Sequence, residues 1–164
     1  MLVGFHHPGI VVSDLEQAQQ FYGEALGFEP IRRDDWDESF SDLVEKVIGV
    51  KNTAAKCLLL KGQNCFLELF EYLSPPSQGD PKKECANDFG IAHLAFQVID
   101  IFAACERLKA AGAITHGEPV QVGAGYSIYC RDPFGNIIEL AQIGADEPDF
   151  DLIKGQLLPA SPNL

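Results

Sequence analysis

Two histidines and two glutamates occupy corresponding places in the two halves of this 164-residue chain. His7 and His93 each open a similar stretch of sequence, and Glu68 and Glu139 each interrupt an apolar run, FLEL or IIEL. A carboxylate buried without a partner is costly, so each glutamate needs a cation, a strong hydrogen bond or water. Two imidazoles and two carboxylates form a mixed nitrogen and oxygen set that suits one divalent Zn, Fe, Mn, Co or Ni ion, with positions left for substrate. Taken singly, each residue is more simply explained as an ordinary core or surface group, but their recurrence in both halves favours a catalytic metal site.

The elements that must position these residues follow from a weak internal repeat. HPGIVVSDLEQAQQFYGEALGF begins at His7 and HLAFQVIDIFAACERLKAAGA begins at His93, with a valine and then an aspartate at matching positions. Apolar residues rich in Val, Ile and Phe predict a buried strand before each aspartate, and helical spacing of apolar residues predicts a helix after it. The predicted N-caps are Asp14 and Asp100, and the glycines at the helix ends are Gly27 and Gly112. Each half is therefore predicted to be strand, helix and then more strands.

The later strands are predicted at 55–61, 64–72, 125–132 and 136–142. The first half is longer by about 15 residues, the length of one short helix. Residues 37–49 supply it, because Phe40, Leu43, Val44, Val47 and Ile48 fall on one helical face. We expect this face to pack in the core, with a substrate pocket as the alternative. The predicted organisation is a first module at 1–73, a linker at 74–90, a second module at 91–142 and a tail at 143–164 with an apolar patch at Leu157–Leu158.

Composition narrows the class of protein. Twelve Lys and Arg against 24 Asp and Glu give a net charge of −12, so a nucleic-acid backbone would be repelled. No run of 18 apolar residues and no basic leader is present, so we expect a cytoplasmic protein without a membrane partner. The five cysteines form no C-x-x-C and are expected to be reduced core thiols, with Cys130 beside Arg131 as the only candidate for a catalytic thiol.

A family resemblance rests on the motifs around the four candidate ligands. The pattern H-x-G-I-V-V-x-D-L, then F-L-E-L, then G-I-A-H-L-A-F and R-D-P-F-G-N-I-I-E-L, resembles the vicinal oxygen chelate superfamily over nearly all of residues 4–142. The resemblance implies an α+β fold in which two β-α-β-β-β modules form an incomplete barrel around a metal site. It also implies His7, Glu68, His93 and Glu139 as the metal ligands, and leaves His6 as a bystander.

Departures from individual members limit what can be carried over. Glyoxalase I enzymes usually continue Leu-Thr-x-Asn after the first glutamate, whereas Glu68 is followed by Leu-Phe-Glu-Tyr, which argues against glutathione. GIAHLAF and ERLKAAG are similar to methylmalonyl-CoA epimerase, but the RDPFGNIIEL ending differs. Tyr129 and the Asp-Pro-Phe-Gly turn resemble extradiol dioxygenases. The acid/base histidine of those enzymes would fall at 120–122, where the chain has Val-Gln-Val, and His116 comes too early.

We therefore predict a metal-dependent lyase or isomerase that moves a proton next to a carbonyl of a small molecule. The ion would hold two substrate oxygens, Glu139 would be the mobile base, and Glu68 would take the reciprocal role. Phe66, Phe70 and Tyr129 are predicted to contact the substrate. The alternatives are an Fe²⁺ extradiol dioxygenase and a drug-sequestering binding protein that needs no metal. Exposed strand edges predict a homodimer, and the site could lie within one chain or be shared by two.

Overall fold

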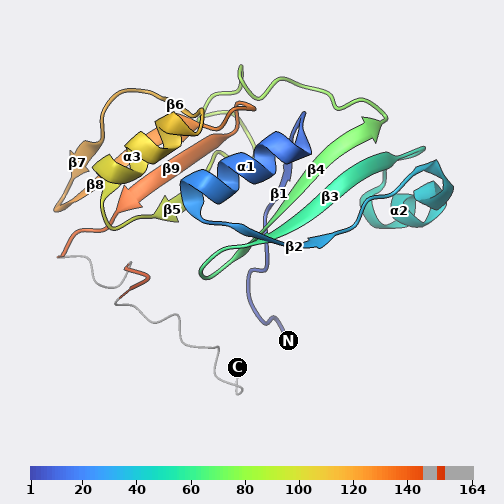
Figure 1. Cartoon of the computed structure of the whole chain (residues 1–164), viewed down its shortest axis with the longest axis horizontal. Helices are drawn as coiled ribbons and strands as arrows, with labels where there is room; N and C mark the ends of the chain where they lie inside the picture. The colour runs from blue at the N-terminus through green and yellow to red at the C-terminus, as the bar shows by residue number, and fades with distance from the viewer. Residues whose placement is uncertain (146–150, 154–164) are drawn as a thin grey trace. The chain divides into compact units, whose positions relative to one another are not determined.

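The computed structural model describes residues 1–145 and 151–153 and contains two compact units. Phe5–Gly79 form the first unit, and Met1–Gly4 with the described residues from Asp80 onward form the second. Each unit carries one mixed β-sheet with a helix packed on it (Figure 1). None of the helices in the described ranges is long and apolar enough to cross a membrane. The predicted module limits stay predictions, and the apolar patch at Leu157–Leu158 lies outside the described residues.

The first unit is a four-stranded sheet in the order β1-β4-β3-β2. Its first strand runs parallel to β4, and the other neighbours are antiparallel. The elements in chain order are β1 (Gly9–Val11), α1 (Leu15–Leu26), β2 (Glu29–Arg33), the 3-10 turn η1 (Glu38–Phe40), α2 (Ser41–Ile48), β3 (Ala54–Lys61) and β4 (Phe66–Ser74). The chain therefore crosses from β1 through α1 before it returns to pair β4 with β1.

The second unit repeats this plan. Its sheet has the order β5-β9-β8-β6, with β7 also paired to β8, and β5 runs parallel to β9. The elements are β5 (Leu94–Gln97), α3 (Ile101–Ala110), β6 (Ile114–Thr115), β7 (Val120–Val122), β8 (Gly125–Arg131) and β9 (Ile137–Gln142). The predicted α+β class and the pair of β-α-β-β-β-like modules are thus confirmed.

The start of each helix is fixed by the same two contacts. Asp14 and Asp100 cap α1 and α3, each accepting a hydrogen bond from the backbone amide three residues later, at 2.9 and 3.0 Å. The first amide of α1 also donates to Glu71 at 2.9 Å, and the first amide of α3 donates to Gln142 at 3.0 Å. These side chains follow Glu68 and Glu139 by the same interval. Each helix is therefore tied to the strand that carries the candidate ligand of its unit.

Strand alternation separates a core face from a polar face in each sheet. In β4, Leu67 and Leu69 are almost fully buried, while Glu68 and Phe70 point the other way and are half-buried. The buried side of β9 likewise carries Ile138 and Leu140. Helices α1 and α3 present apolar side chains that are also buried: Leu15, Ala18, Phe21 and Tyr22 in the first, and Ile101, Ala104, Cys105 and Leu108 in the second. The glutamates thus face away from the helix-covered core.

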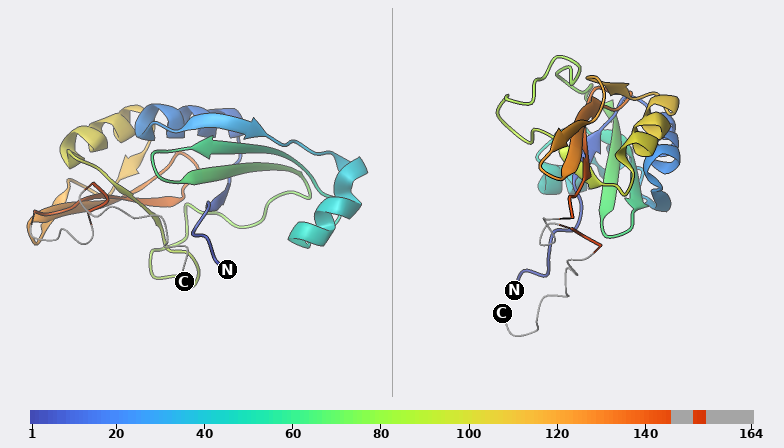
Figure 2. Two further views of the ribbon diagram at one scale, coloured as in Figure 1. Left: turned by 90° about the horizontal axis from the view of Figure 1, so that it is seen from below. Right: turned by 90° about the vertical axis from the view of Figure 1, so that its left-hand side faces the viewer.

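The extra helix of the first half exists but its apolar face does not pack as expected. Side chains of Phe40, Leu43 and Val47 are 57%, 63% and 80% exposed. Helix α2 lies beyond the ends of β3 and β4 instead of on a sheet face (Figure 2). Few side chains of the described residues therefore cover its apolar face. Its buried residue is Ser41, whose hydroxyl accepts from the Thr53 amide at 3.0 Å. The prediction that this face forms core is therefore wrong.

Candidate metal centre

The first candidate pair arises from the register between β1 and β4. Gly9 lies opposite Glu68 in the parallel pairing, and His7 precedes Gly9 by two residues, so His7 projects from the same face of the sheet as Glu68. The Nε2 of His7 lies 3.1 Å from Oε2 of Glu68. Both side chains remain partly accessible, at 32% and 25% exposure. The strand geometry therefore presents one imidazole nitrogen and one carboxylate oxygen at a solvent-accessible point.

The second unit builds the same pair in the same register. Ala95 lies opposite Glu139, and His93 again precedes the paired residue by two positions. The His93 Nε2 lies 3.0 Å from Oε2 of Glu139, with both side chains partly exposed. The repeat predicted from sequence thus extends to side-chain geometry, because two independent His–Glu contacts have the same atoms and almost the same length.

The donor chemistry of these pairs fits a divalent ion of the first transition row. Imidazole nitrogen with carboxylate oxygen is a typical ligand combination for Zn, Mn, Fe, Co and Ni. Within residues 1–145 and 151–153, no group of three or more His, Cys, Asp or Glu side chains gathers closely enough to hold an ion. Each unit therefore brings together two residues of the predicted ligand set, and their binding of an ion, like the binding of one ion by all four, stays a prediction.

The second oxygen of each glutamate has a partner on the neighbouring strand. Oε1 of Glu139 accepts a hydrogen bond from the Ser127 hydroxyl at 2.5 Å, and Oε1 of Glu68 lies 3.5 Å from the Cys57 thiol. Sequence analysis did not identify Ser127 or this contact of Cys57. Along the sequence, Cys57 precedes Glu68 by one residue fewer than Ser127 precedes Glu139, because the turns that join the two strands differ in length. Only the strand register reveals that the two donors correspond.

Tyr129 lies against the second pair. Its hydroxyl is 3.1 Å from Nδ1 of His93, and the two rings are tilted with centroids 4.7 Å apart. Burial, and then the negative charge of Glu139, raise the pKa of Tyr129. The phenol therefore stays protonated at neutral pH and can donate a hydrogen bond.

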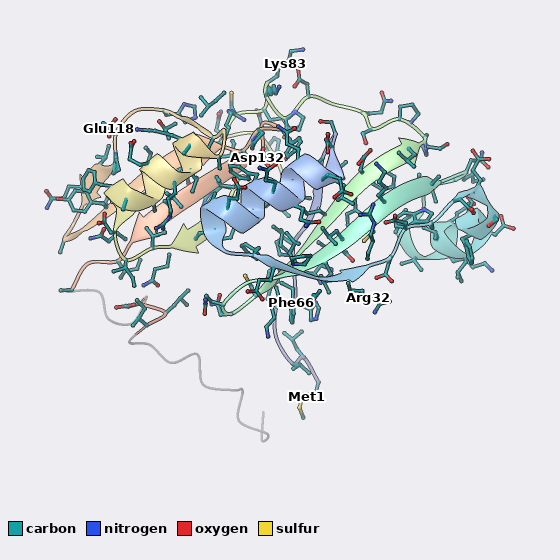
Figure 3. All side chains as sticks on the ribbon, viewed as in Figure 1. Met1, Arg32, Phe66, Lys83, Glu118 and Asp132 are labelled. Carbon is teal, nitrogen blue, oxygen red and sulfur yellow. The ribbon has the colours of Figure 1, made fainter. Side chains whose placement is uncertain are left out.

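Aromatic side chains surround the first pair. Phe66, at the start of β4 (Figure 3), stacks on His6 with centroids 4.8 Å apart. Phe70 stacks on Tyr72 at 6.1 Å, and the Trp36 ring meets Phe70 edge-on at 6.2 Å. Because Phe66 and Phe70 alternate with Leu67 and share the face of Glu68, the predicted substrate residues of this unit lie beside its candidate ligand. Their contact with a substrate stays a prediction.

The surroundings of Cys130 argue against its predicted role as a catalytic thiol. Cys130 is fully buried in β8, and desolvation by burial raises its pKa to about 12. Burial similarly raises the pKa of Cys57 to about 12, with the charge of Glu68 adding to the effect. A thiol acts as a nucleophile only as its thiolate, so neither group is poised for covalent catalysis at neutral pH. The positive charge of Arg131 is used elsewhere, because its guanidinium donates to backbone carbonyls of Pro81, Glu84 and Gly135.

Alkylation of the folded protein should separate the cysteines by exposure. A rise in pKa from 9.0 to about 12 lowers the thiolate fraction of Cys57 and Cys130 by about a thousandfold at pH 8. Cys85 is exposed and should react first with iodoacetamide, as measured by peptide mass spectrometry. In urea all the cysteines should react at similar rates. Labelling of native Cys130 as fast as Cys85 would contradict the burial described above.

Comparison with known proteins identifies the family. The model of the Glyoxalase/Bleomycin resistance protein/Dioxygenase superfamily matches residues 4–140, which include both His–Glu pairs. The chain therefore belongs to this superfamily.

Relatives within the family include an epimerase and a lyase. The 2-epi-5-epi-valiolone epimerase of an Actinomyces species is 31% identical over 153 residues, covering 89% of this chain and 82% of the relative. A Vibrio cholerae protein named "Probable lactoylglutathione lyase" is 30% identical over 138 residues, covering 83% of this chain and 88% of the relative. The crystal structure of a glyoxalase family protein from Bacillus cereus superimposes with a TM-score of 0.78 at 26% identity, covering 87% of this chain and 95% of that one. The distant relatives are thus lyases and epimerases.

Proposed function

We propose that this protein is a metal-dependent lyase or isomerase that moves a proton next to a carbonyl group of a small molecule. The observation that carries the proposal is the pair of matched His–Glu contacts, His7 with Glu68 and His93 with Glu139, at 3.1 and 3.0 Å. Membership in a superfamily whose relatives include an epimerase and a lyase supports this reaction class, since inversion of a stereocentre requires a proton to leave and return. The incomplete barrel around the metal stays a prediction.

We propose that the four residues together hold one divalent ion. When bound, such an ion supplies Lewis-acid polarisation of the substrate oxygens. The chain's own contribution is to orient the substrate and to move the proton. A carboxylate oxygen of Glu68 or Glu139 takes the proton from the carbon next to the carbonyl and returns it to the same carbon or its neighbour. Tyr129, held protonated beside His93, can donate a hydrogen bond to a substrate oxygen.

The aromatic surroundings favour a substrate with an apolar portion. Phe66 and Phe70 are half-buried beside Glu68, and their exposed ring surface can cover such a portion. Tyr129 provides an additional ring beside Glu139. The proposed substrate therefore combines two neighbouring oxygens, which would reach the ion, with a hydrophobic or carbocyclic body that would lie on these rings.

Proton exchange is the direct test of the proposed reaction. The protein loaded with Zn²⁺, Ni²⁺, Co²⁺, Mn²⁺ or Fe²⁺ is incubated in deuterated water with hemithioacetals, acyl thioesters and carbocyclic 2-hydroxyketones. NMR or mass spectrometry should show deuterium entering next to the carbonyl, and removal of the metal with a chelator should stop it. No exchange with any of these compounds, together with tight binding of an aromatic drug by the metal-free protein, would favour the drug-sequestering alternative.

The protein is expected to form a homodimer. Each sheet ends in edge strands, β2 in the first unit and β5 in the second, with unpaired backbone groups that association can cover. Light scattering at micromolar concentration should report twice the mass of 17.9 kDa. A monomeric mass would show this expectation to be wrong.

A mixing experiment distinguishes a site within one chain from a shared site. A His7→Ala chain and a Glu139→Ala chain are inactive separately under the proposed function. If subunits exchange and the ligands come from two chains, random pairing makes about half of the dimers mixed, and each mixed dimer has one intact site of two, so the mixture should recover about a quarter of the activity. If each chain holds its own four ligands, the mixture should stay inactive.

A further inference from the structure

Two donors on the strands next to the glutamates occupy corresponding positions of the two units. In the antiparallel pairing of β3 with β4, Cys57 lies opposite Phe70, two residues beyond Glu68. In the pairing of β8 with β9, Ser127 lies opposite Ala141, two residues beyond Glu139. Each donor is thus the diagonal neighbour of its glutamate on the same sheet face, a position from which a long side chain can be reached.

The two donors contact their glutamates with different strength. The Ser127 hydroxyl donates to Oε1 of Glu139 at 2.5 Å, the length of a strong hydrogen bond from a hydroxyl to a carboxylate. The Cys57 thiol lies 3.5 Å from Oε1 of Glu68, and a thiol is a weak donor. In both glutamates the other oxygen, Oε2, faces the histidine. The two carboxylates therefore have the same kinds of neighbours but differ in how firmly one oxygen is held.

We propose that Ser127 is a positioning residue that fixes the carboxylate of Glu139, whereas Cys57 leaves Glu68 free to turn, so that Glu68 is the mobile base. This inference rests on the proposed function and reverses the assignment expected from the sequence, in which Glu139 was the mobile base. A carboxylate that must collect a proton from substrate has to leave its resting contact. Glu68 gives up a weak thiol contact, while Glu139 would give up a strong hydrogen bond.

The two donors should therefore affect different properties of the enzyme. Loss of the Ser127 hydroxyl frees Glu139 and weakens metal binding, since residues that orient a ligand typically change metal affinity by about 10- to 100-fold. Replacement of Cys57 by serine gives Glu68 a stronger donor and restrains it. That change should leave metal affinity equal or higher but slow proton transfer.

The test combines Co²⁺ titration with proton-exchange kinetics on the full-length protein. Co²⁺ is added to metal-free wild type, Ser127→Ala, Ser127→Thr and Cys57→Ser, and the visible spectrum gives both affinity and ligand geometry. We expect Ser127→Ala to bind Co²⁺ about 10-fold more weakly with an altered spectrum, and Ser127→Thr, which keeps the hydroxyl, to resemble wild type. With metal saturating, kcat for exchange should fall about 5- to 10-fold in Cys57→Ser, the equivalent of one ordinary hydrogen bond that Glu68 must break, and less than 3-fold in Ser127→Ala.

Two variants outside the proposed contacts serve as matched controls. Ser74→Ala removes a hydroxyl that donates to the Asn52 carbonyl at an exposed point of β4, and Cys65→Ser changes a thiol outside these contacts. Both variants should behave as wild type.

Equal Co²⁺ affinity of Ser127→Ala and wild type would overturn the positioning role. A loss of saturated kcat in Ser127→Ala but not in Cys57→Ser would overturn the assignment of Glu68 as the mobile base. Failure of wild type to bind Co²⁺, Zn²⁺, Ni²⁺, Mn²⁺ or Fe²⁺ would instead reject the proposed function itself.

Discussion

Replacing His93 by alanine is expected to abolish stoichiometric metal binding and to lower proton exchange by about a thousandfold, because the several kcal/mol of Lewis-acid stabilisation that a bound ion would supply is lost. The reason is geometric as well as chemical. His93 Nε2 faces Glu139 Oε2 at 3.0 Å, so its loss removes one donor and releases the carboxylate that it holds. Metal content by elemental analysis and exchange by NMR measure the two effects.

His116→Ala provides the matched control for this prediction. His116 belongs to the same unit but is exposed and meets Tyr129 through the backbone, at 3.5 Å. We expect its replacement to change neither metal content nor exchange. Loss of activity in His116→Ala with normal metal content would point back to the dioxygenase alternative, in which a histidine outside the ligand set acts as acid and base.

The parts of the site predicted from sequence were those encoded by local pattern and internal repetition. Asp14 and Asp100 were predicted as helix caps because a cap is a contact between residues three apart. The two histidines and two glutamates were predicted as site residues because the two halves repeat the same order of residues. The structure adds the parallel register that brings His7 to Glu68 and His93 to Glu139.

The parts that sequence analysis missed depend on what lies across or over an element. Ser127 was not predicted because the two turns differ in length by one residue. The distance along the sequence from Ser127 to Glu139 therefore differs from that between Cys57 and Glu68, although the strand register is the same. The apolar face of α2 was assigned to the core because periodicity shows which side of a helix is apolar. Periodicity does not show whether another element covers that side, and Leu43 is 63% exposed.

The turn that leads into β9 should be the most sensitive point for stability in the second unit. Asp132 is 1% exposed, and its Oδ1 accepts from the backbone amides of Phe134 and Asn136 at 2.9 and 2.8 Å. Its Oδ2 accepts from the Asn136 side-chain amide at 2.8 Å. Gly135 completes the turn with a φ of +102°, and an added Cβ there would lie 2.6 Å from the Lys82 backbone nitrogen. This one carboxylate therefore organises the segment that places β9.

Replacing Asp132 by alanine should lower the free energy of unfolding by about 3 kcal/mol, because it leaves buried amide donors without their acceptor and each such loss costs about 1–3 kcal/mol. Urea unfolding followed by circular dichroism measures the change.

Asp132→Asn keeps one acceptor oxygen but places its amide group opposite the amide group of Asn136, so two hydrogen-bond donors face each other. We expect about half of the loss in unfolding free energy. The double variant D132N with N136D exchanges donor and acceptor and should recover part of that loss. If both single variants match wild type and the pair shows no coupling, the carboxylate does not hold the turn. If the coupling appears, the side-chain contact between these two residues stabilises the turn, and β9, the strand that carries Glu139, begins immediately after it.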